Sequence, residues 1–146
     1  MSLLTADPSR IDPEWMTRAL REAGVPLALA SSTGEAAVRR ELGAVGLYDC
    51  FDVVVCGNMV AASKPAPDIF LYAADRLSVD PANCIVVEDS HNGIRAAHAA
   101  GMLAVMVPDS QDVTDEMRRL AGAILPTIES VVPLVKKRLR SSWQEA

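Results

Sequence analysis

The sequence predicts an α/β protein with a doubly wound, Rossmann-like parallel sheet that carries helices on both faces. Two observations lead to this fold class. Short, continuous apolar runs recur along the chain, and segments with helix start and stop signals separate them. Strands that are apolar on both sides are typical of parallel sheets buried between helices. The expected strands are residues 27–30, 52–56, 84–88 and 103–107.

The helical segments are predicted from their boundary residues. Asp12-Pro13-Glu14 combines an N-cap residue, a proline at the first helical position and an acid in the first turn. Ala66-Pro67-Asp68 repeats this pattern, and Gly24 and Gly101 follow the ends of two helical segments. The expected helices are residues 12–24, 35–42, 66–77, 92–100, 113–120 and 128–139.

Composition restricts the class of protein and its partners. A chain of 146 residues with 50% hydrophobic and 23% charged residues suits one globular domain. A net charge of -5 and 4% aromatic residues argue against a nucleic-acid partner. No apolar run approaches the ~20 residues that span a bilayer, so no membrane partner is expected. Cys50, Cys56 and Cys84 have no zinc-site spacing, which predicts reduced thiols and a cytoplasmic location.

Polar residues follow the predicted strands, at the edge where doubly wound sheets bind ligands. Ser31-Ser32-Thr33-Gly34 leads into a helix N-terminus, whose free N–H groups favour an anion. The alternative is plain helix capping by Ser32 or Thr33. Lys64 stands between Ser63 and Pro65, where a restricted backbone directs its ammonium group toward a phosphate or a carboxylate. Its alternative is a solvated surface lysine.

Glu88 and Asp89 close the third apolar strand. Two neighbouring carboxylates at a buried strand end repel each other and are costly to desolvate. A cation relieves that cost, and Mg²⁺ fits best because it prefers oxygen ligands and keeps several waters. The alternative makes Asp89 the N-cap of the following helix.

Three segments, residues 27–32, 63–68 and 87–93, carry a family resemblance. Together they resemble the haloacid dehalogenase-like hydrolase superfamily, in the branch of β-phosphoglucomutase and the sugar-phosphate phosphatases. The resemblance implies a Mg²⁺-dependent phosphatase or phosphomutase that acts on a phosphorylated small molecule.

The same resemblance assigns roles to individual residues. The Ser31 hydroxyl would bind the transferring phosphoryl group, and Lys64 would pair with phosphate and with the nucleophile. Backbone N–H groups of Ser32 and Thr33 would complete the phosphate cradle. The matching acids, Glu88 and Asp89, would hold Mg²⁺.

The chain departs from this family at its start. Members begin with a strand that ends in Asp-x-Asp-Gly-Thr, which supplies the nucleophile and the general acid/base, and a helical cap usually follows. The sequence has no such motif, and Pro8 after Asp7 gives neither the second acid nor the glycine turn. We therefore expect residues 1–11 to be a remnant, 12–140 a partial core and 141–146 a tail, with negligible activity from this polypeptide alone.

The resemblance also implies the strand order 5-4-1-2-3, so the missing strand is the central one. Strands lie about 4.8 Å apart, which would leave a gap of about 10 Å. Either the flanking strands close up, or Ser2–Ala6, a partner chain in an oligomer, or a native N-terminus fills the slot. The alternative function is a non-catalytic phosphate-binding module, or a truncated fragment that needs another segment.

Overall fold

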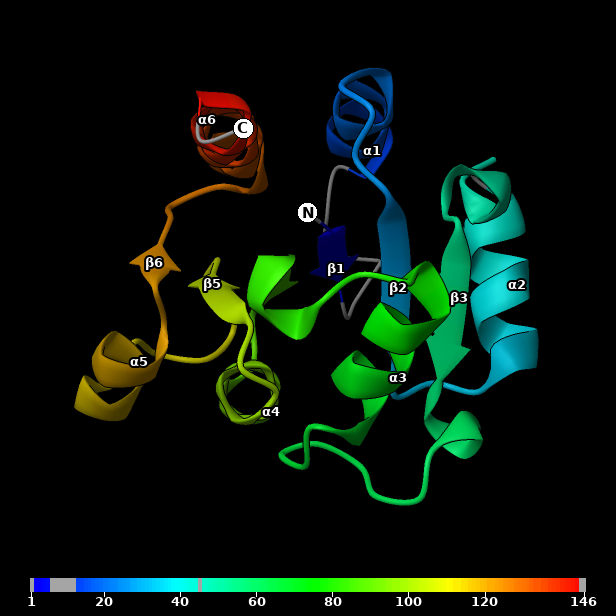
Figure 1. Cartoon of the computed structure of the whole chain (residues 1–146). Coiled ribbons are helices and arrows are strands. Elements are labelled where there is room, and N and C mark those ends of the chain that lie inside the picture. Colours follow the sequence, from blue (N-terminus) through cyan, green and yellow to red (C-terminus); the bar gives the residue numbers. More distant parts are fainter. Residues whose placement is uncertain (1, 6–12, 45, 145–146) are drawn as a thin grey trace.

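The sheet contains six parallel strands in the order β3-β2-β1-β4-β5-β6 (Figure 1). The computed structural model describes residues 2–5, 13–44 and 46–144. The described strands are β1 (Ser2–Thr5), β2 (Leu27–Ser31), β3 (Val53–Cys56), β4 (Cys84–Glu88), β5 (Leu103–Met106) and β6 (Ala123–Ile124). The helices are α1 (Pro13–Glu22), α2 (Glu35–Ala44), α3 (Asp68–Leu77), α4 (His91–Ala99), α5 (Asp115–Leu120) and α6 (Val131–Gln144).

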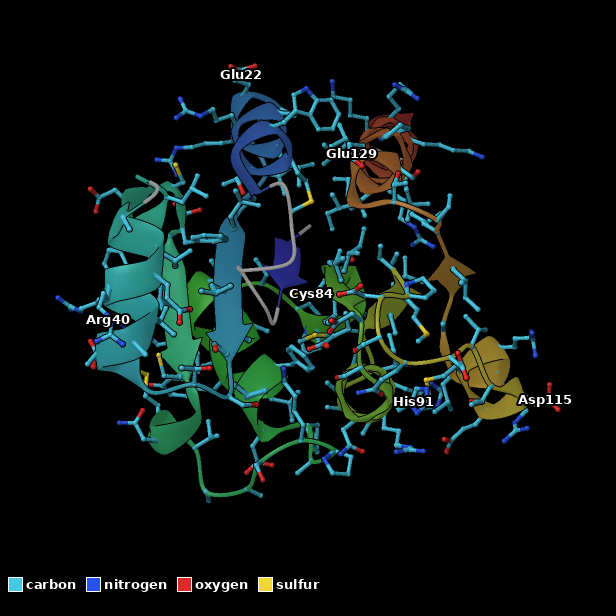
Figure 2. The ribbon with its side chains drawn as sticks, turned by 180° about the vertical axis from the view of Figure 1, so that it is seen from behind. Glu22, Arg40, Cys84, His91, Asp115 and Glu129 are labelled. Atoms are coloured by element: carbon cyan, nitrogen blue, oxygen red, sulfur yellow. The ribbon has the colours of Figure 1, made fainter. Side chains whose placement is uncertain are left out.

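Helices cover both faces of the sheet. Helices α1 and α6 lie on one face, and α3, α4 and α5 lie on the other (Figure 1). Figure 2 shows Cys84 in the middle layer, between Glu22 and Glu129 on one side and His91 and Asp115 on the other. The doubly wound α/β fold predicted from the sequence is therefore confirmed.

Alternate residues of β2 pack against different helical layers, as a strand buried on both faces requires. Ala28 and Ala30 share a core cluster with Phe70 of α3. On the opposite face, Leu29 packs with Val38 of α2. The two clusters hold the sheet between its helical layers and fix the positions of the strand ends.

The central position of the sheet is occupied, which corrects the expectation of a missing central strand. Strand β1 pairs in parallel with both β2 and β4, with Thr5 opposite Leu29 and Val87. Ser2–Thr5, the described part of the segment Ser2–Ala6 that was one of the occupants considered, thus supplies the strand. Backbone groups of β2 and β4 find partners within the same chain, so the sheet needs no second polypeptide to close this gap.

The bounds of the last helix differ from the expected ones. Helix α6 runs from Val131 to Gln144, whereas a helix was expected over residues 128–139. The division of the chain into residues 1–11, 12–140 and 141–146 stays a prediction. The short edge strand β6 was not expected. No helix among the described residues is long and apolar enough to cross a membrane.

Candidate active site

The parallel strands bring the predicted site residues to one edge of the sheet. Thr5 lies opposite both Leu29 and Val87. Ser31 is the last residue of β2 and Glu88 is the last residue of β4, and Asp89 follows directly. The position of β1 separates β2 from β4, so their backbones lie about 10 Å apart. The two strand ends therefore flank the β1 position at the same edge of the sheet.

Lys64 forms a buried ion pair with Glu88 at this edge. The Lys64 Nζ atom lies 2.7 Å from the Glu88 Oε1 atom, and the two side chains are only 9% and 1% exposed. The ammonium nitrogen also lies 5.0 Å from the centroid of the Phe70 ring, a cation–π distance. A solvated surface lysine is thereby excluded, and Lys64 has the carboxylate neighbour that the sequence allowed.

The second oxygen of Glu88 is held from the start of α4. The Ser90 hydroxyl donates to Glu88 Oε2 at 3.1 Å and accepts from the Gly93 N–H at 3.0 Å. Ser90, rather than Asp89, is therefore the N-cap of α4. A Cβ at Gly93 would lie 2.1 Å from Glu88 Cδ, so the position has no room for a side chain.

Ser31 shapes the turn that leads into α2. The residue is buried, with 2% of its surface exposed, and its Oγ atom accepts a hydrogen bond from the Thr33 N–H at 3.1 Å. A hydroxyl that accepts one bond keeps its own hydrogen for donation. Because the Thr33 N–H is engaged within the turn, its role in a phosphate cradle stays a prediction. A Cβ at Gly57 would lie 2.9 Å from the Ser32 carbonyl oxygen, so the loop after β3 packs closely on this turn.

Glu88 and Asp89 have the donor chemistry that Mg²⁺ requires. A carboxylate offers about four lone-pair sites, so the two bonds that Glu88 accepts leave it further capacity. Mg²⁺ is usually held by one or two carboxylates together with waters and substrate phosphates. Within the described part of the chain, no three or more His, Cys, Asp or Glu residues cluster as a metal site. The two acids have the oxygen ligands that suit Mg²⁺ together with water or phosphate oxygens.

Sequence reasoning missed the contribution of Ser90 and Gly93. Residue type alone gave no signal that separates Ser90 from Asp89, because both serine and aspartate cap helices. Sequence reasoning also missed the bracing of α4 by the loop after β5 and by α5. Gln111 accepts from the His91 N–H at 2.8 Å, and Arg95 Nε donates to Glu116 of α5 at 3.0 Å.

Comparison with known proteins identifies the family of the chain. The family model described as haloacid dehalogenase-like hydrolase matches residues 6–101 of the chain. The fructose-1-phosphate phosphatase YqaB of Escherichia coli is 45% identical over 82 residues, which are 56% of this chain and 44% of that protein.

Two solved structures share the fold. The β-phosphoglucomutase of Clostridium difficile has a TM-score of 0.72 at 25% identity, covering 88% of this chain and 57% of that one. CbbY of Rhodobacter sphaeroides, in complex with xylulose-(1,5)bisphosphate, has a TM-score of 0.69 at 31% identity, covering 78% and 52%.

The chain spans between a quarter and about half of the length of the curated relatives it matches. The family match covers β2, β3 and β4, three of the six described strands, and includes the segments that carry Ser31, Lys64, Glu88 and Asp89. The chain therefore belongs to the haloacid dehalogenase-like hydrolase family, in the branch that includes β-phosphoglucomutase and the sugar-phosphate phosphatases.

Proposed function

We propose that this chain provides the phosphate- and Mg²⁺-binding part of a phosphatase or phosphomutase that acts on a small phosphorylated metabolite. The observation that carries the proposal is the buried Lys64–Glu88 ion pair, on the same sheet edge as Ser31 and Asp89. The fructose-1-phosphate phosphatase and the bisphosphate-bound relative support the substrate class.

Each residue of the proposed site has a different role toward a phosphate monoester. The Lys64 ammonium group neutralises charge on the phosphoryl oxygens, and the Ser31 hydroxyl donates a hydrogen bond to one of them. Burial of Lys64 strengthens its field, because less water screens it. Glu88 and Asp89 would hold Mg²⁺, which when bound supplies further neutralisation of phosphoryl charge.

The nucleophile is the part that this sequence does not offer in its usual form. The sequence contains no Asp-x-Asp-Gly-Thr, and Asp7 lies outside the described residues. We infer that this polypeptide alone turns over a phosphate monoester negligibly. A Mg²⁺-dependent turnover of an aryl phosphate that Asp89→Asn abolishes would overturn this inference, and its loss in Asp7→Asn would identify the attacking carboxylate.

The state of the cysteines supports a cytoplasmic location. Cys50, Cys56 and Cys84 form no disulfide within the described part of the chain. Burial raises the pKa of the Cys56 thiol; Glu35 adds to the rise and Arg39 opposes it. The thiol therefore stays protonated and unreactive at neutral pH, as suits a reduced, structural cysteine.

Calorimetric titration with inorganic phosphate in Mg²⁺ buffer tests the phosphate site. Lys64→Met and Ser31→Ala should each weaken binding, by about 10-fold or more for the lysine, because a hydrogen bond to a charged group contributes about 1.5–3 kcal/mol. Lys136→Met, at an exposed position of α6, is the matched control and should bind as the unaltered protein does. Equal affinities for the two lysine variants would contradict the assignment of Lys64.

A non-catalytic phosphate-binding module is the second candidate function. It is favoured by the combination of a sheet completed by β1 and a sequence without the Asp-x-Asp-Gly-Thr motif. Phosphate binding that depends on Lys64 but not on Mg²⁺, without turnover, would support it, because the first proposal expects Mg²⁺ to tighten phosphate binding. Mg²⁺-dependent binding or turnover that Asp89→Asn abolishes would favour the enzyme.

A further inference from the structure

Glu88 is the most completely buried charged residue of the site, at 3% exposure. An ionised carboxylate in such a place is tolerated only when its oxygens are paired and hydrogen-bonded. Lys64 holds Oε1 and Ser90 holds Oε2. The orientation of the Glu88 carboxylate is therefore decided from two sides, by an ammonium group and by a hydroxyl.

The direction of the Ser90 hydrogen bonds follows from the chemistry of their partners. The Gly93 N–H can only donate, so Ser90 Oγ accepts from it at 3.0 Å. An ionised carboxylate can only accept, so the hydroxyl hydrogen goes to Glu88 Oε2 at 3.1 Å. A chain of bonds thus runs from the first turn of α4 through Ser90 and Glu88 to Lys64. The positive end of the α4 dipole polarises this chain toward the carboxylate.

Gly93 makes this arrangement compact. Its absent side chain lets α4 approach the carboxylate, since an added Cβ would come within 2.1–2.5 Å of three Glu88 atoms. The carboxylate therefore fills the space beside the helix start and cannot swing toward it. Ser90 holds the Oε2 oxygen from the same side.

We propose that Ser90 is a positioning residue that sets the Glu88 carboxylate so that its Oε1 oxygen holds the Lys64 ammonium group at the phosphate position. The role exceeds that of a helix cap. Thr114 caps α5 in the same way, accepting from the Met117 N–H at 3.2 Å, and among the described residues its hydroxyl has no carboxylate partner. The effect on phosphate rests on the proposed function, whereas the effect on Lys64 does not.

Nuclear magnetic resonance of the lysine side chains tests the positioning directly. The chain has three lysines. The side chain of Lys64 is buried, whereas Lys136 and Lys137 are exposed. A shielded, ion-paired ammonium group exchanges its protons slowly enough to give a ¹H–¹⁵N signal near neutral pH, and exposed ones do not. Lys64→Arg assigns the signal by removing it.

Four variants separate positioning from capping. Ser90→Ala loses both bonds, and Ser90→Asp keeps a cap acceptor but cannot donate to Glu88. Both should shift or abolish the Lys64 signal and weaken phosphate binding, by about 10-fold for the alanine variant. Ser90→Thr keeps the hydroxyl and should retain signal and affinity. Thr114→Ala loses only a cap and should leave both unchanged.

The outcomes are distinct. If Ser90→Ala retained the Lys64 signal and the phosphate affinity of the unaltered protein, Ser90 would be a helix cap only. If Ser90→Ala failed to fold, Ser90→Asp would decide, and a Lys64 signal unchanged in it would overturn the proposal. A Lys64 signal that responds to Ser90 in a protein that binds no phosphate would support the positioning and refute the proposed function.

Discussion

An ion pair lies at each end of the parallel strands, and the two pairs differ in how far they are exposed to solvent. At the carboxyl edge, Lys64 and Glu88 lie 2.7 Å apart with side chains 9% and 1% exposed. At the amino edge, Arg21 and Asp52 lie 3.9 Å apart with side chains 51% and 45% exposed, beside an open cavity of about 350 Å³. The comparison teaches that burial, and not the presence of charge, distinguishes the candidate active site.

The amino-edge pair serves the fold. Asp52 accepts a hydrogen bond from the Leu27 N–H at 2.8 Å, and Arg21 donates to the Cys50 carbonyl oxygen at 2.9 Å. Both side chains keep contact with water, so they avoid most of the desolvation cost. The carboxyl-edge pair bears that cost, which the proposed ligand-binding role would explain.

Replacing one partner of each pair should give the largest difference. Lys64→Met leaves a buried carboxylate without its cation, and such losses amount to about 3–5 kcal/mol of unfolding free energy. Arg21→Met removes a solvated group and should cost no more than about 1 kcal/mol. Urea denaturation measures both variants. Similar losses at the two edges would break the contrast drawn here.

Filling the space beside Glu88 should give the next largest effect. Gly93→Ala forces a Cβ against the Glu88 carboxylate and should destabilise the protein by about 1–3 kcal/mol, the range for overpacking. Gly43→Ala in α2, where an added Cβ has nothing within 4 Å, is the matched control. It should stabilise by about 0.5–1 kcal/mol through helix propensity. A stabilising effect of Gly93→Ala would mean that the helix does not press on the carboxylate.

The partly exposed Arg95–Glu116 ion pair should make the stability of the protein depend on pH, which compares a third ion pair with the two above. The hydrogen bond from Arg95 lowers the pKa of Glu116 below its ordinary value of 4.5. A lowered folded-state pKa adds stability above pH 4.5, and this contribution is lost as the pH falls through the folded value. Thermal denaturation of Glu116→Gln should therefore differ from the unaltered protein near neutrality and converge with it in acid. Glu41→Gln, an exposed charge loss on α2, is the control.

Much of the sheet was predictable because strong local patterns encode it. Apolar runs such as 84–88 and helix start signals such as Pro67-Asp68 leave few alternative assignments of secondary structure. In this fold class ligands bind beyond the strand ends, which is why Ser31, Lys64, Glu88 and Asp89 were predicted as site residues. The contact between Lys64 and Glu88 was not predictable at this level. It depends on where the loop before α3 folds back across the sheet edge.

Two further features could not be predicted, for different physical reasons. Strand β1 has only four residues, and its partners in β4 lie some eighty positions away, so no local pattern specifies its place. Asp89 and Ser90 are both good N-cap residues. Only the extended backbone of Ser90 and its bond with Gly93 decide between them.

The measurement closest to the central claim is the coupling between Mg²⁺ and phosphate. If Lys64, Ser31 and the two acids form one site, Mg²⁺ should tighten phosphate binding by about 5–150-fold, as coupling energies of about 1–3 kcal/mol imply. Calorimetry with and without Mg²⁺ should find this coupling in the unaltered protein and not in Asp89→Asn. Identical phosphate affinities with and without Mg²⁺, or coupling that survives in Asp89→Asn, would contradict a shared site.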